Sequence, residues 1–165
     1  MQDLLAAMGL SKSSLYQGFG GKKELFIRCI SRYRNNMSEV LAGLLGKAQS
    51  GRFFIEKLLI NFAIEARQPE HLRRGCLLMN TATEFAQKDC QVAEQVTAGF
   101  ERLREALQAA VLRGQQEGDI SPVQDAGVLS DYLICSIGGI TTVVKGGADE
   151  KRVKEIVDVI MKALT

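Results

Sequence analysis

The sequence predicts an all-α protein, and three observations support this fold class. Apolar side chains recur every three or four residues along most of the 165-residue chain, the spacing of one face of a helix. Only two prolines interrupt it, so long helices can form. The sequence shows no β-hairpin signature, internal repeat or low-complexity tract.

The N-terminal residues predict two short helices joined by a tight turn, Gly9-Leu10-Ser11. Gly9 can adopt the left-handed conformation that closes a helix, and Ser11 can cap the next helix by accepting a hydrogen bond from the Ser14 N–H. A helix, a turn and a second short helix form the helix-turn-helix, which places its second helix in the DNA major groove.

The second short helix, over residues 12–19, has two different faces. Leu15 and Phe19 lie four residues apart and face inward, while the opposite face carries Lys12, Ser13, Tyr16 and Gln17. At 1.5 Å per residue this helix is about 12 Å long, comparable with the major groove, which is about 12 Å wide. Its outer face is therefore predicted to contact DNA.

A glycine turn, Gly20-Gly21, opens the next helix with Lys22 and Lys23. Lysines in the first turn oppose the helix dipole, so they are a poor choice for stability but suit a site beside a phosphate. We therefore expect both lysines to bind the DNA backbone. The alternative is that they are solvated side chains on a surface turn.

The remaining sequence predicts further helices. We expect them over about residues 22–47, 52–67, 71–87, 92–117 and 123–144, and after Gly146-Gly147, where the apolar positions are Val153, Ile156, Val157, Ile160 and Leu164. Gly138 and Gly139 lie inside the penultimate helix, where glycine costs about 1 kcal/mol relative to alanine. Small residues allow a second helix to approach closely, which favours a homodimer whose last two helices form a four-helix bundle.

The residues predicted for this dimer interface are Leu129, Leu133, Ile137, Gly138, Ile140, Val153, Val157 and Ile160. The alternative is a contact within one chain, because a buried helix of a monomer has the same composition.

Composition indicates a soluble globular protein, since 46% hydrophobic and 24% charged residues can build a substantial core. The net charge of +2 is uneven: residues 1–34 carry +4 and the remainder −2, which favours a nucleic-acid surface near the N-terminus. We expect no membrane span, because no run is long and apolar enough, and no signal peptide, because Met1-Gln2-Asp3 lacks a basic start. A cytoplasmic location follows.

Cysteine and histidine usage argues against an enzyme, a metal site or a cofactor. Cys29, Cys76, Cys90 and Cys135 are scattered without metal-ligand spacing, and His71 is the single histidine. Cys76 follows Arg73-Arg74-Gly75, whose charges could lower its thiol pKa and make it an electrophile or oxidant sensor. The alternative is an inert buried thiol.

Residues 3–26 resemble the DNA-binding segment of the TetR/AcrR family of bacterial transcriptional regulators, namely its second and third helices and the start of the fourth. The shared features are the Gly-apolar-Ser turn, the Leu15-Tyr16 pair, Phe19 and the Lys22-x-Glu24-Leu25 helix start. The resemblance implies that Lys12, Ser13 and Gln17 face base edges or nearby phosphates. It implies that Ser14, Tyr16 and Lys22 contact the DNA backbone.

The family also carries a first helix of about twenty residues, which completes a three-helix domain, whereas this chain begins within the equivalent of the second helix. We therefore expect an incomplete helix-turn-helix domain over 1–27, in which Leu4, Leu5 and Leu10 lose a packing partner. A helical ligand-binding and dimerisation domain follows over 28–165.

The resemblance further implies a ligand cavity in this second domain. Candidate lining residues are Phe54, Leu58, Phe62, Leu78, Met79, Asn80, Thr83, Phe85 and Phe100, which combine apolar walls with a few polar groups. Apolar residues at helical spacing are also typical of plain core, which is the alternative.

The sequence thus predicts a DNA-binding transcriptional regulator whose partners are double-stranded DNA, a small-molecule effector and a second copy of the chain. We expect a ligand-responsive repressor that binds a palindromic operator as a dimer, and whose effector stabilises a state that binds the operator weakly. The alternative is a helical ligand-binding and dimerisation module that does not bind DNA.

Overall fold

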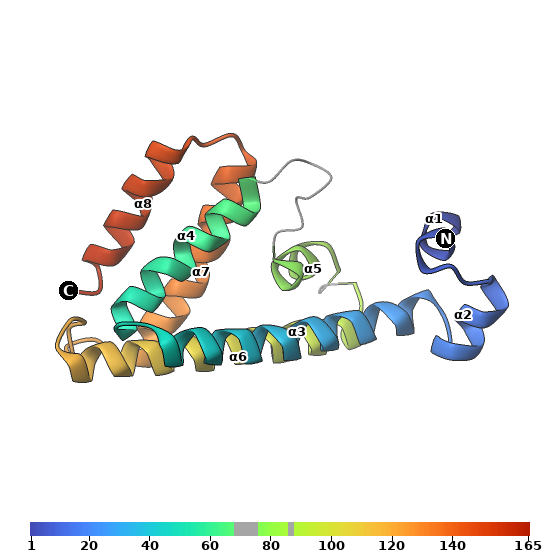
Figure 1. Ribbon diagram of the computed structural model, residues 1–165, viewed down its shortest axis with the longest axis horizontal. Helices are drawn as coiled ribbons and strands as arrows, with labels where there is room; N and C mark the ends of the chain where they lie inside the picture. The colour runs from blue at the N-terminus through green and yellow to red at the C-terminus, as the bar shows by residue number, and fades with distance from the viewer. Residues whose placement is uncertain (68–75, 86–87) are drawn as a thin grey trace.

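The computed structural model describes residues 1–67, 76–85 and 88–165, and these residues form eight α-helices without strands (Figure 1). The all-α prediction is confirmed. In chain order the helices are α1 (Gln2–Met8), α2 (Lys12–Phe19), α3 (Lys22–Lys47), α4 (Gly51–Arg67), α5 (Leu77–Phe85), α6 (Cys90–Glu117), α7 (Ala126–Lys145) and α8 (Glu150–Lys162).

Capping residues set most helix boundaries. Gly9 closes α1 in the left-handed region at φ 63°, and the Ser11 side chain accepts the Ser14 N–H at 3.0 Å, so the predicted turn is confirmed. Asp125 caps α7 by accepting the Val128 N–H, which starts this helix at Ala126 rather than at Val123.

The start of α5 and the end of α8 also differ from the sequence expectation. Helix α5 begins only at Leu77, with Cys76 outside it, and residues 71–75 of the expected helix lie outside the described residues. Helix α8 ends at Lys162, yet Leu164 is still buried because the chain after the helix packs onto the core. The spacing of apolar residues could not show that Cys76 and Leu164 are buried but lie just outside a helix.

Helices α3 and α6 lie side by side along the long axis of the molecule (Figure 1). Helices α4, α7 and α8 pack together at the end where the chain terminates, and α1 and α2 stand at the opposite end. Helix α3 has 26 residues and spans roughly 39 Å at 1.5 Å per residue, so it joins the two ends. It runs unbroken through residues 27 and 28, so the domain boundary placed there remains a prediction.

Helix α7 corrects one expectation from composition. Its 20 residues are long and apolar enough to cross a membrane, although no such run was expected. Leu129, Leu133, Ile137 and Ile140 on this helix are buried, and α7 packs against α4 and α6. The apolar composition of one face of α7 is therefore explained by its place in the core, where α4 and α6 cover that face.

Candidate nucleic-acid interface

Helix α2 presents a polar face to solvent and an apolar side chain to the protein. Leu15 is completely buried, and α2 packs against α3. The predicted contact residues Lys12, Ser13, Tyr16 and Gln17 are all exposed, and Tyr16 leaves 48% of its surface open. The predicted polar face and the inward direction of Leu15 are confirmed, whereas Phe19, also expected to face inward, is only half-buried and lies against the Arg28 guanidinium. The outer surface of α2 is open to a partner that offers hydrogen-bond acceptors and donors.

Ser14 is also exposed, but its surroundings differ from those of the other side chains on α2. Its hydroxyl lies 2.8 Å from the Ser11 hydroxyl, and its backbone N–H donates to the same Ser11 oxygen. Ser14 is therefore held at the first turn of the helix, where backbone N–H groups point outward and attract anions.

The two lysines at the start of α3 lie in different environments. Lys22 is exposed and has no ion-pair partner in the described part of the chain. The Lys23 ammonium lies 2.6 Å from the Asp89 carboxylate, which also caps α6 by accepting the N–H groups of Gln91 and Val92. The hydrogen bond between the two side chains raises the pKa of Lys23 and lowers that of Asp89. Lys22 thus remains available to a phosphate, whereas Lys23 is engaged by α6.

Helix α1 has no buried residue. Leu4, Leu5 and Leu10 are half-buried. Leu4 also lines a cavity of about 560 Å³ with residues of α3, α5 and α6, among them Phe26 and Phe85, whose ring centroids are 5.6 Å apart. The apolar side of α1 therefore remains partly in contact with water.

The residues predicted for a dimer interface lie inside the subunit instead. All of the larger side chains in this set are buried, namely Leu129, Leu133, Ile137, Ile140, Val153, Val157 and Ile160. At Gly138, a Cβ would lie 3.4 Å from the Met79 sulfur of α5. The alternative of a contact within one chain describes these positions. Val128, Tyr132, Cys135 and Gly139 form an exposed stripe on α7, spaced about one helical turn apart, and Asp131, Thr142 and Lys145 of the same helix are exposed as well.

The predicted ligand-binding residues do not gather around one cavity. Met79, Asn80 and Thr83 line an open cavity of about 650 Å³ between α5 and α7, where the Lys145 ammonium donates to the side-chain Oδ1 of Asn80 at 2.8 Å. Phe54 and Leu58 line a smaller cavity of about 200 Å³. Of the others, Phe85 lies at the cavity near α1, Phe100 is half-buried against the core, and Phe62 and Leu78 are core residues.

Cys76 is 2% exposed, so its thiol is buried, as the alternative interpretation predicted. Arg73, Arg74 and His71 lie outside the described residues. Tyr33 of α3 is the side chain beside this thiol, and burial, followed by the neighbouring Cys76, raises the pKa of the Tyr33 hydroxyl. Cys76 thus belongs to the packed junction between α3 and α5.

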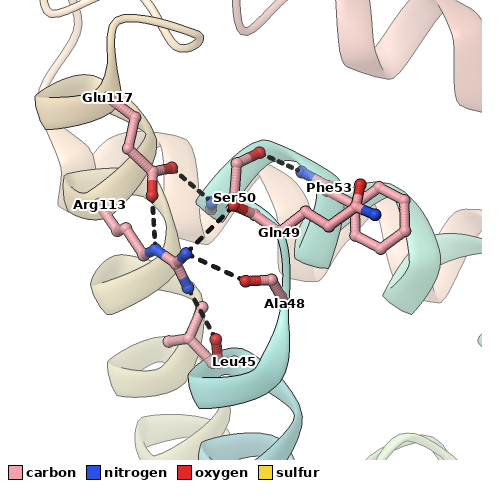
Figure 2. A network of polar contacts seen from close by, with 8 residues as sticks. Leu45, Ala48, Gln49, Ser50, Phe53, Arg113 and Glu117 are labelled. Carbon is pink, nitrogen blue, oxygen red and sulfur yellow. Dashed lines mark hydrogen bonds and ion pairs between the residues drawn. The ribbon is translucent and has the colours of Figure 1, made fainter.

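Sequence reasoning missed a polar network that fastens α6 to the end of α3 (Figure 2). Arg113 donates to the carbonyl oxygens of Leu45 at 2.8 Å and Ala48 at 3.0 Å, and to Glu117 at 2.7 Å. Glu117 in turn accepts the Gly51 N–H at 2.8 Å, where α4 begins. The carbonyls at the end of α3 and the first N–H of α4, which lack partners within their own helices, are thereby satisfied.

This network shifts the pKa of Glu117. The Gly51 N–H lowers that pKa most, followed by the Arg113 guanidinium. The only sequence signal was the opposite charge of Arg113 and Glu117 four residues apart on one helix, which is common on solvated helices. Nothing local in the sequence indicates the backbone acceptors.

Comparison with known proteins agrees with this arrangement. The family described as tetracyclin repressor-like, C-terminal domain, matches residues 57–160. The chain is 27% identical over 165 residues to the uncharacterized HTH-type transcriptional regulator YezE of Bacillus subtilis (strain 168), covering 99% of this chain and 84% of YezE. It is 24% identical over 163 residues to the HTH-type transcriptional repressor ComR of Escherichia coli (strain K12), covering 94% of this chain and 74% of ComR.

A solved structure shares the fold. The TetR family transcriptional regulator CifR, as a cysteine mutant complexed with 26bp double-strand operator DNA, matches with a TM-score of 0.83 at 22% identity. The match covers 100% of this chain and 86% of that one.

Proposed function

This chain belongs to the tetracyclin repressor-like (TetR) family, and we propose that it is a transcriptional regulator that binds double-stranded DNA through α2. The observation that carries this proposal is the exposed polar face of α2 beside the buried Leu15. A short helix with this division of faces can enter the major groove while its apolar side stays on the protein. The relatives named as HTH-type regulators, and the related fold solved with operator DNA, support it.

Each exposed side chain has a role in this proposal. Lys12, Ser13 and Gln17 face base edges or nearby phosphates, and Ser14, Tyr16 and Lys22 contact the sugar-phosphate backbone. Lys23 can add a phosphate contact only by leaving Asp89, because its ammonium lies 2.6 Å from that carboxylate. We therefore assign a larger part of the electrostatic contact to Lys22.

The regulator acts as a homodimer in this proposal, because two recognition helices about 34–36 Å apart match a palindromic operator. Since the buried residues of α7 and α8 are occupied by the core, the second copy packs on the exposed α7 stripe of Val128, Tyr132, Cys135 and Gly139. Close approach is possible at Gly139, where a Cβ would lie more than 4 Å from the atoms of the described residues.

The effector site is placed at the cavity between α5 and α7. Its volume is about 650 Å³, and its lining includes Met79, Asn80, Thr83 and the Lys145 ammonium. Glu84, Thr141 and Thr142 also line this cavity, so one acidic and one basic side chain face it and the lining suits a small polar molecule that both donates and accepts hydrogen bonds. Such a ligand would shift the population toward a state that binds the operator weakly, and operator binding would then be released. In this proposal the regulator is a repressor that acts in the cytoplasm and has no catalytic activity.

The DNA proposal is tested by selecting bound fragments of the host genome with this chain and measuring affinity for the selected duplex at several salt concentrations. Gln17→Ala and Tyr16→Ala are expected to weaken binding. Lys22→Ala is expected to reduce the slope of log affinity against log salt by about 0.9. The matched control is Lys47→Ala, which removes the same charge from the far end of α3 and should change neither quantity.

If the wild-type chain binds no fragment more tightly than random duplex, the alternative of a helical module without DNA binding replaces this proposal.

A further inference from the structure

Arg28 joins the last turn of α2 to the second turn of α3. Its guanidinium donates to the Gly18 carbonyl oxygen at 3.3 Å, and its central carbon lies 5.4 Å from the centroid of the Phe19 ring. Gly18 and Phe19 are the last two residues of α2. One side chain of α3 thus makes both a hydrogen bond and a cation–π contact with the end of the preceding helix.

This end of α2 needs a partner from outside the helix. The last four carbonyl groups of a helix accept no hydrogen bond from within the helix, and together they carry the negative end of the helix dipole. The Gly20 N–H caps the Tyr16 carbonyl, which leaves the Gly18 carbonyl to Arg28. A guanidinium at this point satisfies an unpaired carbonyl and complements the dipole at once.

Among the residues that the structure describes, α2 has few other points of attachment. The helix has eight residues, of which only Leu15 is buried, and helices this short are marginal without tertiary contacts. A single buried side chain fixes one point of the helix but not the direction of its axis, so the helix can still rotate about that point. Arg28 contacts α2 one turn beyond Leu15 and therefore provides a second point of attachment.

We infer that Arg28 is a positioning residue for DNA recognition: it sets the orientation of α2 on α3 without itself contacting DNA. This inference rests on the proposed function, since orientation matters only if α2 reads base edges. The Arg28 guanidinium is engaged by α2, because one of its N–H groups donates to Gly18 and one of its faces lies over the Phe19 ring. Misalignment of α2 would weaken binding to the selected sequence more than binding to random duplex, because base contacts need exact geometry and phosphate contacts do not.

The first test compares Arg28→Ala, Arg28→Lys and Arg32→Ala. Arg32 lies one turn further along α3, is exposed, and forms no hydrogen bond with any residue that the structure describes, so it is the matched control for charge. Arg28→Ala is expected to weaken binding to the selected duplex by roughly 10-fold and to random duplex by less than about 2-fold. Arg28→Lys should recover part of the loss, since it keeps the charge but not the planar fork.

The salt dependence decides between positioning and a phosphate contact. A positioning residue leaves the slope of log affinity against log salt unchanged, whereas loss of a phosphate contact lowers the slope by about 0.9. A lowered slope for Arg28→Ala, or an equal loss on random and selected duplex, would overturn the inference.

The second test needs no DNA. Amide hydrogen exchange of residues 12–20 in the free protein is expected to be faster in Arg28→Ala, partly restored in Arg28→Lys and unchanged in Arg32→Ala. If the wild type selects no DNA but this order of exchange is found, the proposed function fails while the attachment by Arg28 stands. If the wild type binds DNA and Arg28→Ala changes neither exchange nor selectivity, the inference is wrong.

Discussion

Replacing Gly51 by alanine is expected to destabilise the fold, because α4 begins against the backbone of α6. A Cβ at this position would lie 2.6 Å from the Gly114 nitrogen and closer still to the Ala110 carbonyl oxygen. Both are backbone atoms of a continuous helix, so no side-chain rotation can relieve the contact. Helix α4 must instead move away from α6, in a region where packing is dense.

Overpacking of this kind costs about 1–3 kcal/mol, and more where backbone must move. For a chain of this size, each kcal/mol shifts Tm by about 2–4 °C, so the Gly51→Ala protein should melt roughly 2–12 °C below the wild type. The control is Gly46→Ala on the exposed side of α3, where a Cβ would meet none of the described atoms within 4 Å. There alanine should stabilise by about 0.5–1 kcal/mol through helix propensity.

Thermal unfolding followed by circular dichroism, at one protein concentration because dimerisation would shift Tm, measures both variants. The same substitution is thus expected to act in opposite directions at two glycines separated by five positions. The reasoning would be refuted if Gly51→Ala melted at or above the wild type, or if both variants moved in the same direction by similar amounts.

Further predictions concern α2 and the two ends of α6. Leu15→Ala should abolish hydrogen-exchange protection of α2, since Leu15 is its single buried side chain, whereas Tyr16→Ala should leave protection intact; equal effects would contradict this. The pKa of Glu117 is held below its ordinary value of 4.5, so its ionised form stabilises the fold above that pH and the contribution is lost as pH falls through the lower folded value. Glu117→Gln should therefore melt below the wild type near neutral pH and approach it in acid, and a constant gap in Tm across that range would count against the network. Asp89→Ala should lower Tm more than Asp89→Asn, because asparagine keeps the cap of α6 while losing the charge that faces Lys23, and identical values would argue against the cap.

The helix-turn-helix could be predicted from sequence because its determinants are local. The Gly9 turn, the Ser11 cap and the inward direction of Leu15 each depend on residues within one or two helical turns. Backbone conformation and short-range hydrogen bonds decide such features, so the pattern of residue types is sufficient.

The partners of individual side chains could not be predicted in the same way. Lys22 and Lys23 are adjacent and chemically identical, yet only Lys23 meets Asp89, 66 residues later in the chain. The apolar residues of α7 fit a dimer interface or a core equally well by spacing, and their burial between α4 and α6 distinguishes the two. The candidate ligand residues line different cavities for the same reason. Helical spacing shows which residues share a face of a helix, but not which other helix covers that face.

The sequence by itself determined that this chain is helical, which segments form most of its helices, and which side of α2 is polar. Only the tertiary structure decided that Arg113 and Glu117 fasten α6 to the junction of α3 and α4, that Arg28 reaches the end of α2, and that the apolar side of α7 is core. The physical reason is that helix formation depends on interactions within a few residues. Packing and ion pairing, in contrast, depend on which distant segments the folded chain brings within contact distance.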